Sequence, residues 1–144
     1  MRVPTLILAC AAAAATASGA AAASGGARVV GDCVHSQVRP SMVVLFCADA
    51  NAALTHLRWS KFGGATARAT GDYAFNDCKP YCAAGKVHSY PVTAVFSRPR
   101  RCPDGRRDYR VLVAAYASAT NRPSGTDGGR GTPGSFTLNC PIKG

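Results

Sequence analysis

The sequence contains no glutamate, four lysines and a single tryptophan among its 144 residues. Solvent-exposed helices normally carry glutamate and lysine on their surface, so the scarcity of both disfavours a long exposed helix. The lack of glutamate also restricts catalysis, because the paired carboxylates of a glycoside hydrolase would both have to be aspartates. Six of the seven aspartates fall at expected turns or strand ends, where aspartate commonly bonds the local backbone: Asp49, Asp72, Asp77, Asp104, Asp108 and Asp127.

Familiar catalytic motifs are absent as well. The chain has no Gly-x-Ser-x-Gly elbow, no His-Glu-x-x-His and no glycine-rich phosphate loop before a helix, and no motif indicates a cofactor. His56 and His88 lie beside the starts of expected strands, and either could act as a general base. A single histidine on a strand is more often a surface or structural residue. We therefore predict a non-catalytic protein with no catalytic residue, and keep an unrecognised hydrolase as an alternative.

Length and composition indicate one folded domain. A chain of 144 residues leaves no room for two independent cores. Its hydrophobic fraction of 47% is too high for intrinsic disorder, because enough apolar surface can be buried to offset chain entropy. The formal net charge is +10, and arginine supplies most of the positive charge.

The N-terminal segment resembles a secretory signal peptide. Arg2 supplies a positive charge, residues 3–15 are apolar, and small residues continue to Ala27 with several Ala-x-Ala triplets. We expect residues 1–27 to be the signal, cleaved somewhere between residues 17 and 27, and residues 28–144 to be a secreted domain. A transmembrane anchor is the rival interpretation, but the run is mostly alanine with serine and glycine rather than strongly apolar.

Cys10 leaves a second destination open. The segment Ile7-Leu8-Ala9-Cys10 resembles a lipobox, in which a lipidated cysteine would tether the protein to a membrane. The apolar run before Cys10 is short for such a signal. Free secretion is therefore favoured, with Cys10 discarded together with the signal.

Six cysteines remain after the signal is removed, and an even number in a small exported chain indicates disulfides. They are Cys33, Cys47, Cys78, Cys82, Cys102 and Cys140. Many pairings are possible; we favour Cys33–Cys47, Cys78–Cys82 and Cys102–Cys140, because each closes a plausible local or strand-to-strand loop. Zinc is the alternative, since Cys78 and Cys82 have metal-like spacing and three histidines are available. No second close pair of ligands exists, and export favours oxidised cysteine, so no metal is predicted.

Alternation of apolar and polar residues predicts strands along most of the secreted part. The expected strands cover residues 41–47, 57–60, 65–75, 90–96, 107–118 and 135–140, separated by turn signals such as Pro103-Asp104-Gly105. Trp59 alternates in step with Leu57 and is expected to anchor the core rather than to form an exposed sugar platform. The pattern predicts an all-β fold, a small antiparallel β-sandwich (Ig-like or a partly open barrel) held by disulfides.

Two segments depart from the strand pattern. Residues 49–54 could form a helical turn with Asp49 as its cap. Residues 124–134 hold five glycines and no apolar side chain, which indicates a loop between the last two strands rather than a domain linker.

Basic charge is concentrated in one part of the sequence. Six arginines fall within 13 residues around the Pro103-Asp104-Gly105 turn: Arg98, Arg100, Arg101, Arg106, Arg107 and Arg110. Arginine suits bidentate recognition of phosphate and carboxylate, so this hairpin is a candidate anion-binding site. An ordinary solvated loop that Asp104 and Asp108 partly neutralise is the simpler interpretation of this cluster, and the sequence favours it over a dedicated binding site. Only one aromatic residue is close, which does not indicate specific nucleic-acid binding.

Several residue groups of the chain form a recognisable pattern: Arg39-Pro40, residues 43–51, Leu57-Arg58-Trp59-Ser60, Ala69-Thr70-Gly71, the stretch from Asn76 to Gly85 and Cys102. Together they resemble a family of small secreted cysteine-containing proteins from high-GC Gram-positive bacteria. The Cys-x-Pro-x-Cys-Ala-x-Gly element is the most specific part. Phe62 stands where that family often has a second tryptophan. The resemblance implies export and a cysteine framework; it implies no ligand and no catalytic residue.

The sequence predicts two alternative functions. The first is a secreted, non-catalytic protein that binds an anionic cell-surface polymer or another protein outside the cell. The second is a secreted protease inhibitor, since small exported β-rich proteins can present a loop to a protease. The 124–134 loop would then enter the protease, with Arg130 as its specificity residue, although an effective inhibitor loop is usually more rigid.

Overall fold

The computed structural model describes residues 25–118 and 133–142. These residues form eight strands and one short 3-10 helix, joined by turns and loops. Six strands form one antiparallel sheet in sequence order: β3 (Val43–Val44), β4 (Ala52–Lys61), β5 (Thr66–Asn76), β6 (Val87–Arg101), β7 (Arg107–Tyr116) and β8 (Ser135–Thr137). A separate antiparallel pair joins β1 (Val29–Val30) to β2 (Ser36–Gln37), and the 3-10 helix η1 spans Cys82–Ala84. The predicted all-β class is confirmed.

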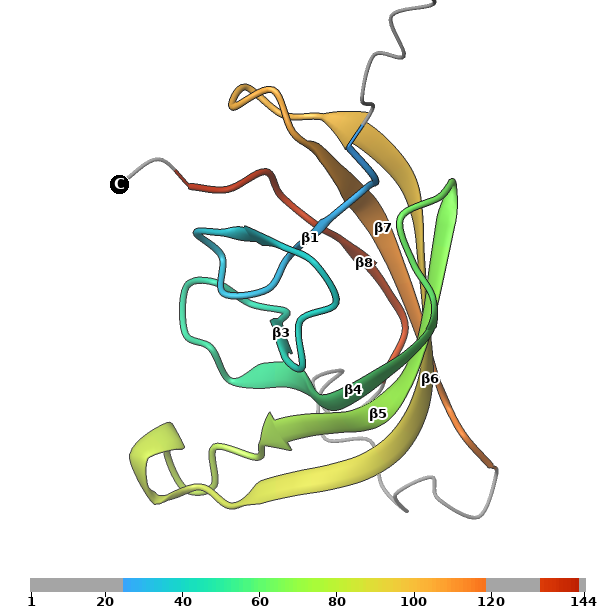
Figure 1. The fold of residues 1–144 in the computed structure, drawn as a ribbon. Coiled ribbons are helices and arrows are strands. Elements are labelled where there is room, and N and C mark those ends of the chain that lie inside the picture. The colour runs from blue at the N-terminus through green and yellow to red at the C-terminus, as the bar shows by residue number, and fades with distance from the viewer. Residues whose placement is uncertain (1–24, 119–132, 143–144) are drawn as a thin grey trace, which may run out of the picture.

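The large sheet curls into a half-barrel, with the β1 segment lying inside its curve (Figure 1). This corresponds to the partly open barrel, the second of the two architectures that the sequence suggested. Val29 of β1 and Val43 of β3 are fully buried in the same core as the sheet residues. The β1 segment therefore supplies the inner layer that a single curled sheet would otherwise lack. The β1–β2 pair was not among the strands expected from the sequence.

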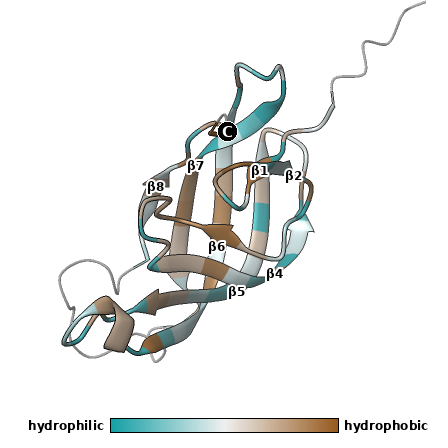
Figure 2. Cartoon of the chain, turned by 90° about the vertical axis from the view of Figure 1, so that its left-hand side faces the viewer, coloured by the Kyte–Doolittle hydropathy of each residue, from teal (hydrophilic) through white to brown (hydrophobic). Residues whose placement is uncertain are grey.

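The long strands bury alternate side chains, as their sequence pattern predicts. Ala67, Ala69, Tyr73 and Phe75 of β5 are buried, and on β6 the buried residues are Val92, Ala94 and Phe96. In Figure 2 the middle of β6 and β7 is correspondingly hydrophobic. Small alanines in the centre of β5 and β6 leave room for the aromatic side chains around them.

Trp59 is half-buried and takes part in packing rather than forming an exposed platform. Its ring lies 4.8 Å from that of Phe62 and 5.0 Å from that of Phe96, measured between centroids. Its indole N–H donates a 2.8 Å hydrogen bond to the Pro40 carbonyl. The expected role as a core anchor agrees with these contacts.

A bulge interrupts the pairing of β4 with β5. The register shifts between Thr55 and Arg58, and His56 adopts a left-handed backbone with φ of 51°. Gly71 lies opposite, where an added Cβ would stand 2.5 Å from the Thr55 carbonyl oxygen. Only glycine fits this position without displacing the neighbouring strand.

Two local predictions are wrong in detail. Residues 49–54 do not form a helical turn: the Ala50 N–H bonds the Phe46 carbonyl in a tight turn, and β4 begins at Ala52. Strand pairing wins there because Ala52 and Leu54 are buried on the sheet opposite β5. The expected strand over residues 41–47 shortens to Val43–Val44, since the chain turns back at Phe46.

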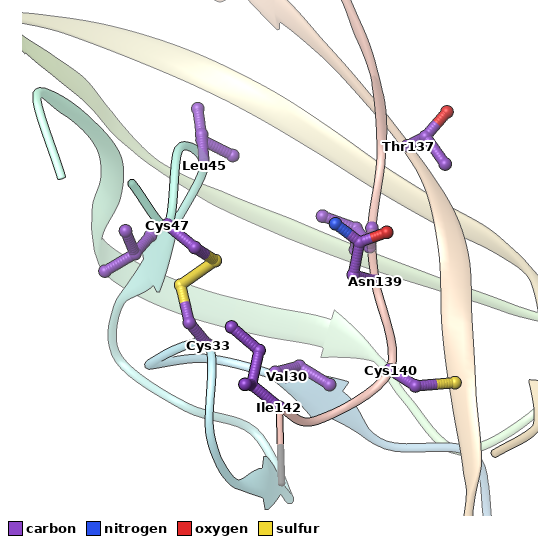
Figure 3. A pocket seen from close by; sticks show the side chains of 10 residues that line it. Val30, Cys33, Leu45, Cys47, Thr137, Asn139, Cys140 and Ile142 are labelled. Atoms are coloured by element: carbon purple, nitrogen blue, oxygen red, sulfur yellow. A yellow bond between two sulfur atoms is a disulfide. The ribbon is translucent and has the colours of Figure 1, made fainter. Parts of the chain in front are cut away.

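Three disulfides join Cys33 to Cys47, Cys78 to Cys82 and Cys102 to Cys140, the pairs that the sequence analysis favoured. The first and third flank the gap between the β3 and β8 edges of the sheet. Figure 3 shows the cavity in this gap, lined by Cys33, Leu45, Cys140 and Ile142 among others. Its volume of about 30 Å³ has room for a water or two and not for an organic ligand.

Candidate functional site: an arginine cleft at one end of the half-barrel

The turn between β6 and β7 is held rigidly by local bonds. The Cys102 N–H donates to the Arg106 carbonyl (2.8 Å) and the Gly105 N–H to the Cys102 carbonyl (2.9 Å). Gly105 has φ of 83°, a conformation that glycine adopts without strain. The Asp104 carboxylate accepts the Arg106 N–H at 3.0 Å, and Arg101 Nη1 donates to the Gly105 carbonyl at 2.8 Å. The arginines beside the turn thus project from a defined backbone.

Arg28, distant in sequence, lies against the same hairpin. Its N–H donates to the Arg107 carbonyl (2.8 Å), and its own carbonyl accepts the Tyr109 N–H (3.0 Å). These bonds form a parallel bridge between Arg28 and Asp108. The segment leading into β1 is therefore fixed beside β7, and it brings a further arginine to the hairpin.

Four arginines line one cleft between these two segments. The cleft has a volume of about 210 Å³, and its lining consists of Gly25, Gly26, Arg28, Arg101, Gly105, Arg106 and Arg107. None of the described carboxylates is part of this lining. The nearest ion pair at the rim joins Arg106 to Asp104, at 3.4 Å. In Figure 2 the tip of the β6–β7 hairpin is the hydrophilic segment at the top of the molecule.

The six arginines singled out from the sequence have different positions in the structure. Arg101, Arg106 and Arg107 line the cleft, whereas Arg98 and Arg100 are exposed on β6 outside its lining.

Arg110 is half-buried and bonds internally, from Nε to the Leu138 carbonyl (2.6 Å) and from Nη1 to Cys140 Sγ (2.8 Å). Arg110 thus braces the β8 segment instead of adding to the cleft. Arg28 was missed by the sequence analysis because only the packing of the β1 segment against β7 brings it to the hairpin.

Asp108 follows Arg107 on β7 and is fully buried. Its Oδ2 accepts a 2.8 Å hydrogen bond from the Ser36 hydroxyl of β2, and no described residue bonds its Oδ1. Burial raises the pKa of the Asp108 carboxyl above its ordinary value, while the Ser36 hydrogen bond and the charges of Arg106 and Arg28 act in the opposite direction. The sequence analysis treated Asp108 as a strand-end residue; its side chain instead links β2 to β7.

Each histidine pairs with an aspartate. The distances are 2.8 Å for His35–Asp32, 3.0 Å for His56–Asp72 and 2.9 Å for His88–Asp77. No histidine lines the arginine cleft or the cavities beside it. Within the described residues, no group of three or more histidine, cysteine or aspartate side chains is arranged to hold a metal ion.

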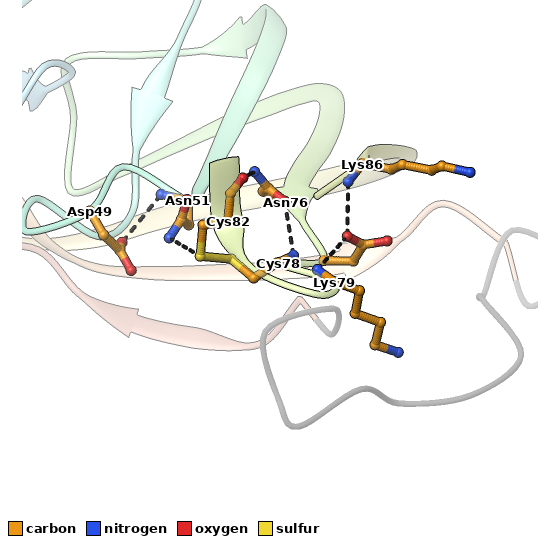
Figure 4. Close-up of a disulfide and its surroundings, with 8 residues drawn as sticks. Asp49, Asn51, Asn76, Cys78, Lys79, Cys82 and Lys86 are labelled. Atoms are coloured by element: carbon orange, nitrogen blue, oxygen red, sulfur yellow. Dashed lines mark hydrogen bonds between the residues drawn. A yellow bond between two sulfur atoms is a disulfide. The ribbon is translucent and has the colours of Figure 1, made fainter. Parts of the chain in front are cut away.

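The loop that carries the Cys-x-Pro-x-Cys-Ala-x-Gly element lies at the opposite end of β5 and β6 from the β6–β7 hairpin (Figure 1), and Figure 4 shows its disulfide and hydrogen bonds. Asp77 Oδ1 accepts the backbone N–H groups of Lys79 (3.1 Å) and Lys86 (2.8 Å), while Asn76 Oδ1 accepts that of Cys78 (2.9 Å). The His88 ring bonds the other Asp77 oxygen, and together these contacts lower the pKa of Asp77 to about 2. Within the described residues, these contacts of the element stabilise the loop itself.

Comparison of the chain with protein-family models, with curated proteins and with solved structures finds no match. Across residues 25–118 and 133–142, no helix is long and apolar enough to span a membrane. The signal segment with Cys10, and most of the 124–134 loop with Arg130, lie outside the described residues.

Proposed function

We propose that the chain is a secreted, disulfide-stabilised protein that binds an anionic partner outside the cell through the arginine cleft, without catalysing a reaction. The observation that carries this proposal is the convergence of Arg28, Arg101, Arg106 and Arg107 on one cleft with no carboxylate in its described lining. Guanidinium groups bind phosphate and carboxylate oxygens through paired N–H donors.

Export is supported by the cysteines. Three intramolecular disulfides persist in oxidising compartments and are rare in reducing ones. The signal-like N-terminal sequence points to the same destination. Anionic partners available there include lipid headgroups, wall polymers and acidic polysaccharides.

The electrostatics of the arginine cleft also supports anion binding. Holding several arginines around one cleft raises the free energy of the empty protein, because like charges repel at short range. Backbone bonds fix Arg28 against Arg107 in spite of this repulsion. An anion in the cleft would relieve the repulsion and would gain charge-assisted hydrogen bonds.

The test is equilibrium binding to inorganic polyphosphate at low and moderate salt. The wild-type protein should bind, and the triple variant Arg28→Gln, Arg106→Gln, Arg107→Gln should bind roughly a hundredfold more weakly, at about 1 kcal/mol for each arginine. Arg58→Gln is the matched control, since Arg58 is an exposed arginine in the middle of β4. Equal affinity of the wild-type protein and the triple variant, with both folded by circular dichroism, would refute the proposal.

The protease-inhibitor alternative depends on Arg130 and the 124–134 loop. Nothing in the described residues favours it over anion binding. Inhibition assays against trypsin-like and subtilisin-like proteases, repeated with Arg130→Ala, would test it directly.

A further inference from the structure

The arginine cleft is flanked on both sides by cavities that share its residues. Gly26 and Arg28 also line a cavity of about 240 Å³ that includes Val38, Arg39 and Phe62. Arg106 also lines a cavity of about 360 Å³, whose other described residues are Val34, Pro103, Asp104, Pro141 and Ile142. The three hollows therefore adjoin one another at this end of the half-barrel, and we call the surface that they make up, the depression, the arginine end.

The flanking cavities carry exposed apolar side chains. Val34 is 44% exposed, Val38 is 60% exposed and Ile142 is 55% exposed. An isolated exposed valine is ordinary on a protein surface. Here the three side chains belong to the β1–β2 connection, the segment after β2 and the C-terminal segment. Val38 lines a cavity with Arg28, and Val34 and Ile142 line one with Arg106, so each cavity includes an arginine of the cleft. The packing of three separate segments thus surrounds a cationic centre with apolar side chains.

The charge of the arginine end is strongly positive. Five arginines line the depression: Arg28, Arg39, Arg101, Arg106 and Arg107. Of the aspartates nearby, Asp104 is paired with Arg106 and Asp108 is buried, while Asp32 is an anionic carboxylate bonded to His35, so the arginines outnumber the exposed carboxylates. A partner of this surface must therefore be anionic, and it must also receive apolar side chains.

We propose that the arginine end binds the surface of a lipid bilayer containing anionic lipids. Headgroup phosphates would occupy the arginine cleft, and Val34, Val38 and Ile142 would enter the boundary between headgroups and acyl chains. A bilayer presents negative charge directly above an apolar phase, which matches the composition of this surface. A soluble polyanion offers the charge alone and gives the valines no partner. The inference rests on the proposed function and specifies its partner.

The opposite end of β6 provides an internal comparison. Val87, where β6 begins, is 70% exposed and lies beside Lys86, so it resembles Val38 beside Arg39 in side-chain type. The carboxylate of Asp77 lies within the same loop and accepts the Lys86 N–H. None of the cavities that make up the arginine end includes Lys86 or Val87. This end supplies control substitutions of matched exposure.

The experiment measures binding of the full secreted chain to phosphatidylcholine vesicles with and without phosphatidylglycerol, in parallel with binding to polyphosphate. The double variant Val34→Ser, Val38→Ser should bind phosphatidylglycerol vesicles about tenfold more weakly than the wild type, with unchanged affinity for polyphosphate. Val87→Ser should leave both affinities unchanged. Val38→Phe should strengthen vesicle binding several-fold, with the variant folded by circular dichroism.

The outcomes separate the inference from the proposed function. Binding to polyphosphate without binding to phosphatidylglycerol vesicles would overturn the bilayer inference and leave anion binding intact. Vesicle binding that responds to the arginine substitutions but not to the valine substitutions would also overturn it, because charge alone would then explain the interaction. Binding to neither probe would overturn both.

Discussion

The aspartates show how the surroundings of a residue decide its role. Asp49, Asp77 and Asp104 each accept a backbone N–H two residues further along, as expected for aspartate in turns. Asp108 was also expected at a strand end. Its role is different because the β1–β2 pair covers its side chain, and the Ser36 hydroxyl of β2 donates a hydrogen bond to it. The short-range sequence pattern predicted the turn residues; the burial of Asp108 depends on a segment more than seventy residues away in the chain.

The buried carboxyl of Asp108 makes stability depend on pH. Its pKa in the folded protein is raised by burial above the unfolded value near 3.8, so the stability it contributes is fully present below pH 3.8 and is lost as the pH rises through the folded pKa. Asp108→Asn, which cannot ionise, should therefore become more stable relative to the wild type between pH 4 and pH 7. Urea unfolding of both proteins at the two pH values measures the difference; a difference that stays constant with pH would contradict the account.

At the scale of strands, alternating burial was readable from the sequence and pairing partners were not. β5 and β7 follow their predicted ranges closely, because each long strand repeats its buried positions every second residue. β6 was predicted over residues 90–96 and extends further in both directions, over Val87–Arg101. β1, β2 and β3 contain two residues each, too few for any period to appear. Their positions are set by contacts with distant strands.

Gly71 is the position in the sheet where a single added carbon should be most damaging. A Cβ there would stand 2.5 Å from the Thr55 carbonyl and 3.0 Å from a methyl carbon of Leu57, in the centre of the β4–β5 pairing. Gly71→Ala should lower the free energy of unfolding by about 3 kcal/mol. Gly64→Ala is the matched control, since its added Cβ meets nothing closer than 3.9 Å. Equal midpoints of thermal unfolding for the two variants would contradict the bulge geometry.

The Cys102–Cys140 disulfide connects the arginine hairpin to the C-terminal segment. The two residues are 38 positions apart, so the bond closes the longest loop of the three. The double variant Cys102→Ala, Cys140→Ala should lose about 3 to 4 kcal/mol of stability in urea unfolding. It should also bind polyphosphate more weakly below its unfolding transition, because the hairpin would lose its anchor. An unchanged free energy of unfolding in the double variant would contradict this prediction.

For the whole molecule, the fold limits where the proposed signal segment can be cleaved. Ala27 is 1% exposed within the core, and its N–H donates to the Gly63 carbonyl at 3.0 Å. Signal cleavage should therefore precede Ala27, which narrows the range of 17–27 that the sequence allowed. Intact mass and N-terminal sequencing of the secreted protein measure the cleavage site. A mature chain that begins at Arg28 or later would conflict with this packing.

The composition of the arginine cleft could be anticipated only in part. Clustering in sequence pointed to the β6–β7 hairpin because neighbouring residues on a hairpin stay close in space. It could not distinguish Arg107, which lines the cleft, from Arg110, which bonds the Leu138 carbonyl. Nor could clustering in sequence identify Arg28 and Arg39. Arg28 lines the cleft and Arg39 lines the cavity beside it, because the segments before β1 and after β2 pack at the arginine end. The arginine end is thus a property of the assembled half-barrel.

The salt dependence of polyphosphate binding tests the arginine cleft most directly, because each arginine that contacts an anion adds to the slope of log K against log salt. The wild-type protein should show a steep negative slope, and the triple variant Arg28→Gln, Arg106→Gln, Arg107→Gln should show a slope shallower by about three. Arg58→Gln should retain the wild-type slope. Identical slopes for the wild-type protein and the triple variant would mean that the cleft takes no part in binding.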